Sequence, residues 1–173
     1  YGAGWAAMQL GKRETARQRF ESVLKRTFSE PAWRGFHTLA LGRIGEMHVG
    51  DRQYDKAIAV YTQGLRNEPE NVELLYGYGT ALRATGQNEK ALGRFEAALK
   101  LNPRHPGALV GKAAIYYELG NVPEAFRLLE EAVAAAPSNP LAYGVIGALY
   151  EDMKRPDEAR LMLGHYYFYA GDL

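Results

Sequence analysis

The stretch that decides the fold is Glu89-Lys90-Ala91-Leu92, because it recurs at a fixed distance along the chain. Related stretches are Asp55-Lys56-Ala57-Ile58, Pro123-Glu124-Ala125-Phe126 and Asp157-Glu158-Ala159-Arg160. A spacing of 34 residues separates their alanines, Ala57, Ala91, Ala125 and Ala159. Self-similarity at a period of about 20–50 residues indicates a protein built from stacked copies of one structural unit.

The side chains around each alanine also keep the same sizes. Small residues precede the alanines by 12 positions, at Gly45, Gly79, Ala113 and Gly147. Large residues follow them by four positions, at Tyr61, Phe95, Leu129 and Leu163. Prolines, which cannot continue a helix, follow three of them by 12 positions, at Pro69, Pro103 and Pro137. This pattern predicts two closely packed helices per unit, with Gly86 and Gly120 as left-handed residues between the two helices.

The pattern resembles the tetratricopeptide repeat (TPR) family over nearly the whole chain. The resemblance implies an all-α fold, a superhelix or α-solenoid of antiparallel helix pairs with about ten helices in all. We expect four full units, at residues 38–71, 72–105, 106–139 and 140–173.

Residues 1–37 fit a truncated first unit followed by a lengthened junction. Ala16 and Phe20 match the alanine and the large residue of an earlier second helix, but Ala16 lies 41 residues before Ala57, seven more than the period. Either a lengthened first helix that begins near Pro31 or a longer loop through Thr27–Glu30 can hold the extra residues.

At the other end, the last helix of residues 140–173 also fits the start of a further repeat that the chain does not contain. Its aromatic cluster, Tyr166–Tyr169, lies where a repeat protein normally has a polar cap. We therefore expect the chain to be a piece of a longer protein. Self-association through the truncated ends is a further expectation.

Composition argues against several functional classes. The 173 residues carry 21 Lys and Arg against 20 Asp and Glu, and this net charge of +1 disfavours nucleic acid as the partner. The apolar runs are too short to cross a membrane. There is no cysteine, and the histidines lack the spacing of a zinc helix, so no metal, cofactor or catalytic residue is expected. His48 is expected to pack between helices and His105 to lie in an exposed loop.

The remaining candidate is a binding surface. In the TPR family, certain positions of each first helix line the concave groove that binds a peptide or a helix. Carried onto this sequence, those positions predict the groove residues Arg43, Glu46, Glu73, Tyr76, Thr80, Arg83, Ala114, Tyr117, Glu118 and Glu151. Gly77 and Gly111 fall at groove positions too, where they would leave room for a ligand. The alternative is that some of the tyrosines pack on the neighbouring repeat.

The charged groove residues restrict the type of ligand. The lysine and asparagine set with which chaperone-binding TPR proteins clamp a C-terminal carboxylate is missing here. A chaperone-tail adaptor is therefore disfavoured, although Arg43 and Arg83 could still hold another carboxylate.

One feature goes beyond the general repeat. Residues Arg155–Leu173, an alanine-containing helix that ends in aromatic residues and Gly-Asp, resemble the C-terminal TPR region of bacterial BepA-like periplasmic zinc metalloproteases. The resemblance implies a non-catalytic interaction module of a larger periplasmic protein in outer-membrane protein quality control. The alternative is a generic adaptor or scaffold with no attached protease, in the periplasm or the cytoplasm.

Overall fold

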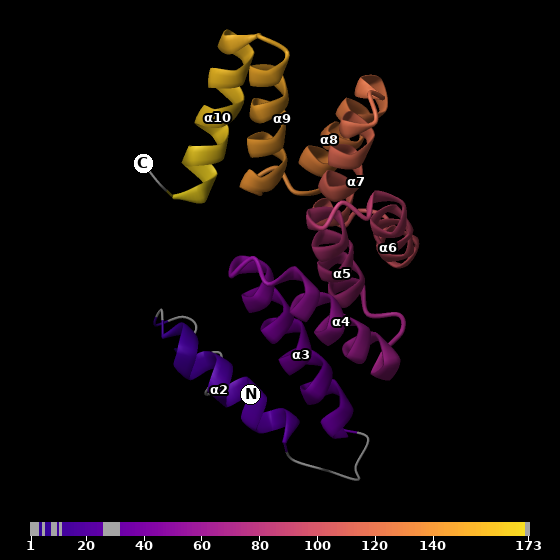
Figure 1. Ribbon diagram of the computed structural model, residues 1–173. Helices are drawn as coiled ribbons and strands as arrows, with labels where there is room; N and C mark the ends of the chain where they lie inside the picture. The colour runs from indigo at the N-terminus through magenta and orange to yellow at the C-terminus, as the bar shows by residue number, and fades with distance from the viewer. Residues whose placement is uncertain (1–3, 5, 8–9, 11, 26–31, 172–173) are drawn as a thin grey trace. The chain divides into compact units, whose positions relative to one another are not determined.

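The computed structural model describes residues 4, 6, 7, 10, 12–25 and 32–171. Within these residues it contains nine helices and no strand, which confirms the predicted all-α architecture. The helices are α2 (Arg13–Leu24), α3 (Ala32–Gly50), α4 (Tyr54–Asn67), α5 (Val72–Ala84), α6 (Asn88–Leu101), α7 (Pro106–Glu118), α8 (Val122–Ala135), α9 (Pro140–Asp152) and α10 (Pro156–Ala170). Figure 1 shows them as successive helices joined by short turns.

The chain forms two compact units, Tyr1–Ala91 and Leu92–Leu173. In the first unit α3 packs against α2, α4 and α5, and its core holds Phe20, Ile44, Tyr61 and Leu74. In the second unit α7 packs on α8 and α9 on α10, and the core there contains Leu109, Ala113, Leu128, Leu129, Ala132, Ile146 and Leu149. Each helix therefore buries its apolar face only by packing on its neighbours.

Helix lengths repeat with the sequence. The first helices α5, α7 and α9 have 13 residues each, and the second helices α4, α6 and α8 have 14. The exception is α3, with 19 residues. It begins at Ala32, so the expected unit boundary between residues 37 and 38 falls inside this helix. The expected start at Pro31 and the alternative loop Thr27–Glu30 lie outside the described residues.

Three first helices begin with a side-chain cap that recurs every 34 residues. The side chains of Asn71 and Asn139 accept hydrogen bonds from the backbone N–H groups of Leu74 (3.1 Å) and Leu141 (2.9 Å). His105 takes the same place before α7, where its Nδ1 accepts from the N–H of Ala108 at 3.0 Å. The expectation of an exposed loop residue is wrong, because His105 is only 8% exposed and caps the helix.

The turns between paired helices share a left-handed residue, also with a period of 34. Gly86 and Gly120 have φ values of 75° and 80°, as the sequence predicts. The equivalent residues Arg52 and Lys154 adopt φ values of 57° and 58°. A side chain in this region is strained, because its Cβ approaches the backbone carbonyl oxygen.

Substitution of Arg52 or Lys154 by glycine is therefore expected to raise the free energy of unfolding by about 1 kcal/mol. Glycine adopts positive φ without strain, and this gain exceeds the entropy that glycine adds to the unfolded chain. Urea unfolding monitored by circular dichroism measures the change. Gly86→Ala is the matched control and should destabilise by a similar amount; a loss of stability in both glycine variants would contradict the argument.

Candidate functional site

The first unit contains a tyrosine ring held between two glycines on different helices. Tyr61 of α4 is 2% exposed. A Cβ atom added to Gly45 of α3 or to Gly77 of α5 would lie 2.5 Å from Cζ of this ring. Gly77 therefore has a packing role that the groove expectation did not include. Gly111 repeats it in the second unit, where an added Cβ would lie 2.5 Å from Cζ of Phe95.

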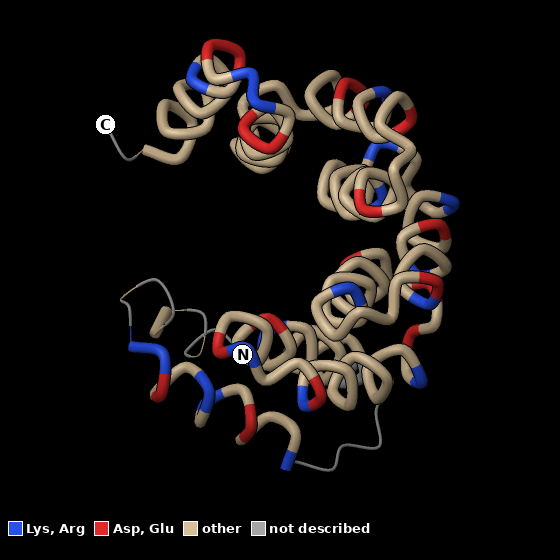
Figure 2. The backbone as a smooth tube through the Cα atoms, turned by 45° about the horizontal axis from the view of Figure 1, so that its top comes forward, with Lys and Arg blue, Asp and Glu red and all other residues tan. Residues whose placement is uncertain are grey.

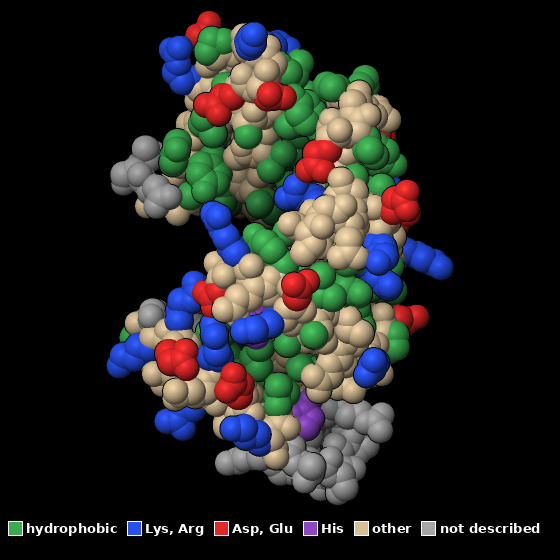
Figure 3. Space-filling model, in the orientation of Figure 1, with side chains coloured by type: hydrophobic (Ala, Val, Ile, Leu, Met, Phe, Trp, Pro, Cys, Tyr) green, Lys and Arg blue, Asp and Glu red, His purple; other side chains and the backbone are tan. Residues whose placement is uncertain are grey.

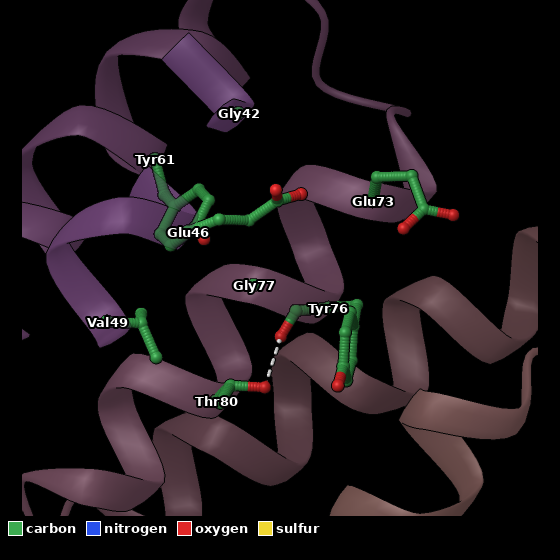
Figure 4. Close-up of a pocket in the computed structure, with 8 residues that line it drawn as sticks. All are labelled: Gly42, Glu46, Val49, Tyr61, Glu73, Tyr76, Gly77 and Thr80. Atoms are coloured by element: carbon green, nitrogen blue, oxygen red, sulfur yellow. Dashed lines mark hydrogen bonds between the residues drawn. The ribbon is translucent and has the colours of Figure 1, made fainter. Parts of the chain in front are cut away.

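A pocket of about 170 Å³ opens beside this tyrosine, between α3 and α5. Figure 4 shows Glu46 and Val49 on α3, and Glu73, Tyr76 and Thr80 on α5, around the pocket. Gly42, Tyr61 and Gly77 complete its lining. The Thr80 hydroxyl donates to the backbone carbonyl of Tyr76 at 3.1 Å, which holds the polar end of this side chain against its own helix. The walls thus combine aromatic surface with two carboxylates.

A second hollow of about 130 Å³ shares Gly42, Glu46 and Glu73 with this pocket and adds Arg43. The Arg43 guanidinium donates to both carboxylate oxygens of Glu46, at 3.1 and 2.8 Å. We call the two hollows together the α3–α5 groove. The cation on this surface is therefore paired with a carboxylate of the groove itself.

Both tyrosines of the pocket are harder to ionise than a tyrosine in water. Burial raises the pKa of Tyr61, and the negative charge of Glu46 raises it further. Burial also raises the pKa of Tyr76, with Glu73 adding to the effect, while the hydrogen bond with Thr80 opposes it. Both hydroxyls therefore stay protonated at neutral pH.

The structure brings together four of the predicted groove residues of the first unit: Glu46, Glu73, Tyr76 and Thr80 all line the pocket. Arg43 lines the adjoining hollow. Arg83 lines neither of the two hollows and is partly exposed in the last turn of α5. Whether these residues bind a peptide stays a prediction.

The predicted groove residues of the second unit do not form one pocket. The hydroxyl of Tyr117 on α7 donates to Oδ2 of Asp152 on α9 at 2.5 Å, and this hydrogen bond raises the pKa of Tyr117. Glu151 lines a different hollow, formed with the first half of α10. Ala114 is partly buried and Glu118 is exposed.

Sequence reasoning missed Tyr61 as a pocket residue, because its place in the repeat predicts a core side chain. One signal was available: the equivalent places carry Phe95, Leu129 and Leu163, none of which has a polar atom. A hydroxyl at one place in an apolar series indicates that the end of this side chain meets a polar surface. Gly42 and Val49 gave no such signal.

The C-terminal half of α10 presents aromatic side chains. His165 and Tyr169 stack on Tyr143 of α9, with ring centroids 5.1 and 5.5 Å away. Phe168 is 63% exposed and Tyr167 46% exposed. Figure 3 shows hydrophobic side chains over α9 and α10. The expected self-association through this end stays a prediction.

Charges in the second unit concentrate at one end of the α9–α10 pair, near the turn from Asp152 to Pro156, and both signs occur there (Figure 2). Across the described ranges, no three His, Asp or Glu side chains lie close enough to hold a metal ion. In the same residues, no helix is long and apolar enough to cross a membrane.

His48, expected as a packing residue, is only partly buried. Its Nδ1 lies 2.9 Å from Oε1 of Gln53, in the turn that joins α3 to α4. The side chain therefore contributes a polar contact at this turn in addition to its contacts within the helix pair.

Known structures with the same fold are numerous, at low sequence identity. A thermophilic TPR protein from Thermus thermophilus is similar with a TM-score of 0.78 and 22% identity, over 97% of this chain and 88% of that chain. MamA from Desulfovibrio magneticus RS-1, from its residue 41 to its end, gives 0.67 and 16%, over 98% and 92%. A TPR protein from Parabacteroides merdae ATCC 43184 gives 0.66 and 18%, over 97% and 64%.

At these identities the structural neighbours show the fold alone. No curated protein sequence is significantly similar to the chain. Three family models match it, at residues 1–26, 48–94 and 79–140, and each describes a tetratricopeptide repeat. Together with the 34-residue period and the helix pairs, these matches show that the chain belongs to the tetratricopeptide repeat family.

Proposed function

We propose that this chain is a protein-interaction module that binds an extended segment or a helix of a partner protein in the α3–α5 groove. The observation that supports the proposal is the pocket of about 170 Å³ whose floor belongs to the packed core and whose rim carries Glu46, Glu73 and Tyr76. Tyrosine supplies a large contact area at little cost in side-chain entropy. A rigid floor with an amphipathic rim suits recognition of a side chain from a partner.

The proposal assigns binding rather than catalysis to this surface. No histidine lines the pocket, and its aliphatic hydroxyl, that of Thr80, donates to a backbone carbonyl. A nucleophile without a base in hydrogen-bond reach is not activated. The two carboxylates are better explained as contacts for a ligand than as an acid and a base.

A photo-crosslinking experiment in the host cell tests the binding surface. Tyr76 is replaced by p-benzoyl-phenylalanine, which keeps an aromatic ring at the pocket rim, and cross-linked partners are identified by mass spectrometry. Tyr54, partly buried at the start of α4 and outside the pocket lining, receives the same replacement as the control. A defined partner cross-linked from position 76 and not from position 54 is expected. Equal yields, or none from position 76, would refute the groove as the binding surface.

We further propose that the module serves a larger periplasmic protein with a zinc metalloprotease domain. This proposal depends only on the resemblance of Arg155–Leu173 to BepA-like proteins. The coding sequence upstream of this segment tests it, because a His-Glu-x-x-His helix there would supply the zinc ligands. A different upstream domain would favour the generic adaptor.

A further inference from the structure

We propose that the pocket between α3 and α5 takes a lysine or arginine side chain from the partner polypeptide. The inference depends on the proposed function, since it names the chemistry of the partner that binds in the same groove. It differs from the carboxylate ligand that Arg43 and Arg83 first suggested.

The charge of the pocket is the first argument. Two of its eight lining residues, Glu46 and Glu73, are acidic and none is basic. The nearest cation of the groove, Arg43, is bound to Glu46 and compensates for one negative charge only. A carboxylate ligand would meet like charges here, whereas an ammonium or guanidinium group is attracted.

The floor of the pocket provides a polar group for such a cation. An added Cβ on Gly77 would lie 2.6 Å from the Tyr61 hydroxyl oxygen, and one on Gly45 would lie 3.0 Å from it. The hydroxyl is therefore at the base of the pocket, between α3 and α5, on a side chain that is almost fully buried. Within the described part of the chain, no hydrogen bond is formed by this hydroxyl. Its oxygen can accept an N–H from a bound cation while Glu46 or Glu73 accepts another.

The walls suit the aliphatic part of a long basic side chain. Val49 and the Tyr76 ring lie on opposite helices of the pocket, as Figure 4 shows. Lysine and arginine bury their methylene groups on apolar surface and keep the charge in a polar environment. A tyrosine face also attracts a cation that lies within about 6 Å of the ring centre. The pKa values of Tyr61 and Tyr76, which are raised in part by the carboxylates, agree with a negative local potential.

Two-dimensional NMR of the isotope-labelled full chain tests the inference. The probes are short alanine peptides, acetylated and amidated, whose central residue is lysine, arginine, norleucine or glutamate. The lysine and arginine peptides are expected to shift the backbone amides of Val49, Gly77 and Thr80. Norleucine has the length of lysine without its charge, so equal shifts with norleucine, or no shifts with either basic peptide, would overturn the inference.

Charge-neutral variants supply the second arm. The double variant Glu46→Gln with Glu73→Gln is expected to weaken binding of the lysine peptide by about tenfold or more. The matched control, Glu21→Gln with Glu70→Gln, changes the net charge equally at exposed residues outside the pocket and should leave binding nearly unchanged. Equal losses in the two double variants would show a general charge effect and overturn the pocket assignment.

The two proposals fail in different ways. Cross-links from position 76 to a partner, without any preference for basic peptides, would keep the interaction surface and reject the basic side chain as its ligand. The absence of specific cross-links from position 76 would reject the proposed function itself, whatever the peptides do.

Discussion

Replacement of Tyr61 by alanine is expected to lower the free energy of unfolding by about 3–5 kcal/mol. The side chain is among the largest that the chain buries completely, and its ring fills the space that Gly45 and Gly77 leave between α3, α4 and α5. Those glycines have no side chains that could move into the cavity. Urea unfolding monitored by circular dichroism measures the loss.

Tyr61→Phe separates packing from the hydroxyl group. It keeps the ring between the two glycines and is expected to cost less than about 1.5 kcal/mol. A loss below about 1 kcal/mol for Tyr61→Ala would mean that the three helices do not depend on this ring. The phenylalanine variant, still folded, also shows how much the hydroxyl contributes to binding of the lysine peptide.

The repeat period made most of the fold predictable. It placed Ala57, Ala91 and Ala125 at buried positions, and all three are 0% exposed. It also placed Gly86 and Gly120 at the left-handed turns that they form. These features depend on the backbone and on side-chain size, which a 34-residue period specifies at every repeat.

The pocket was predictable in part, for a related reason. Glu46, Glu73, Tyr76 and Thr80 were expected on one surface because the face of a helix follows from residue spacing. The partner of each side chain on the next helix does not follow from spacing. Thus the pairing of Arg43 with Glu46, and of Tyr117 with Asp152, came only from the structure.

His105 shows where reading residue by residue goes wrong. Its two neighbouring prolines, Pro103 and Pro106, suggested an exposed loop, yet the side chain caps α7. The spacing to Asn71 and Asn139 held the information, since asparagine is a preferred capping residue and histidine lies between the two at the same interval. A histidine nitrogen can accept the same hydrogen bond only through the lone pair of its unprotonated form.

Gly77→Ala is expected to destabilise the first unit by about 2–3 kcal/mol, although alanine normally favours a helix. The added Cβ would lie 2.5 Å from Cζ and 2.6 Å from the hydroxyl oxygen of Tyr61. The ring cannot move away toward α3, because Gly45 is in equally close contact with it there. Thermal and urea unfolding of the variant measure the cost.

Gly93→Ala is the matched control, since Gly93 lies on α6, is exposed, and would have no atom within 4 Å of an added Cβ. It should stabilise the chain by about 0.5–1 kcal/mol through helix propensity alone. Opposite signs for the same substitution would identify the clash with Tyr61 as the cause. The double variant Gly77→Ala with Tyr61→Leu should then be less destabilised than the sum of its single variants, because the smaller side chain leaves room for the new methyl group. Strict additivity would instead place the cost of Gly77→Ala somewhere other than this contact.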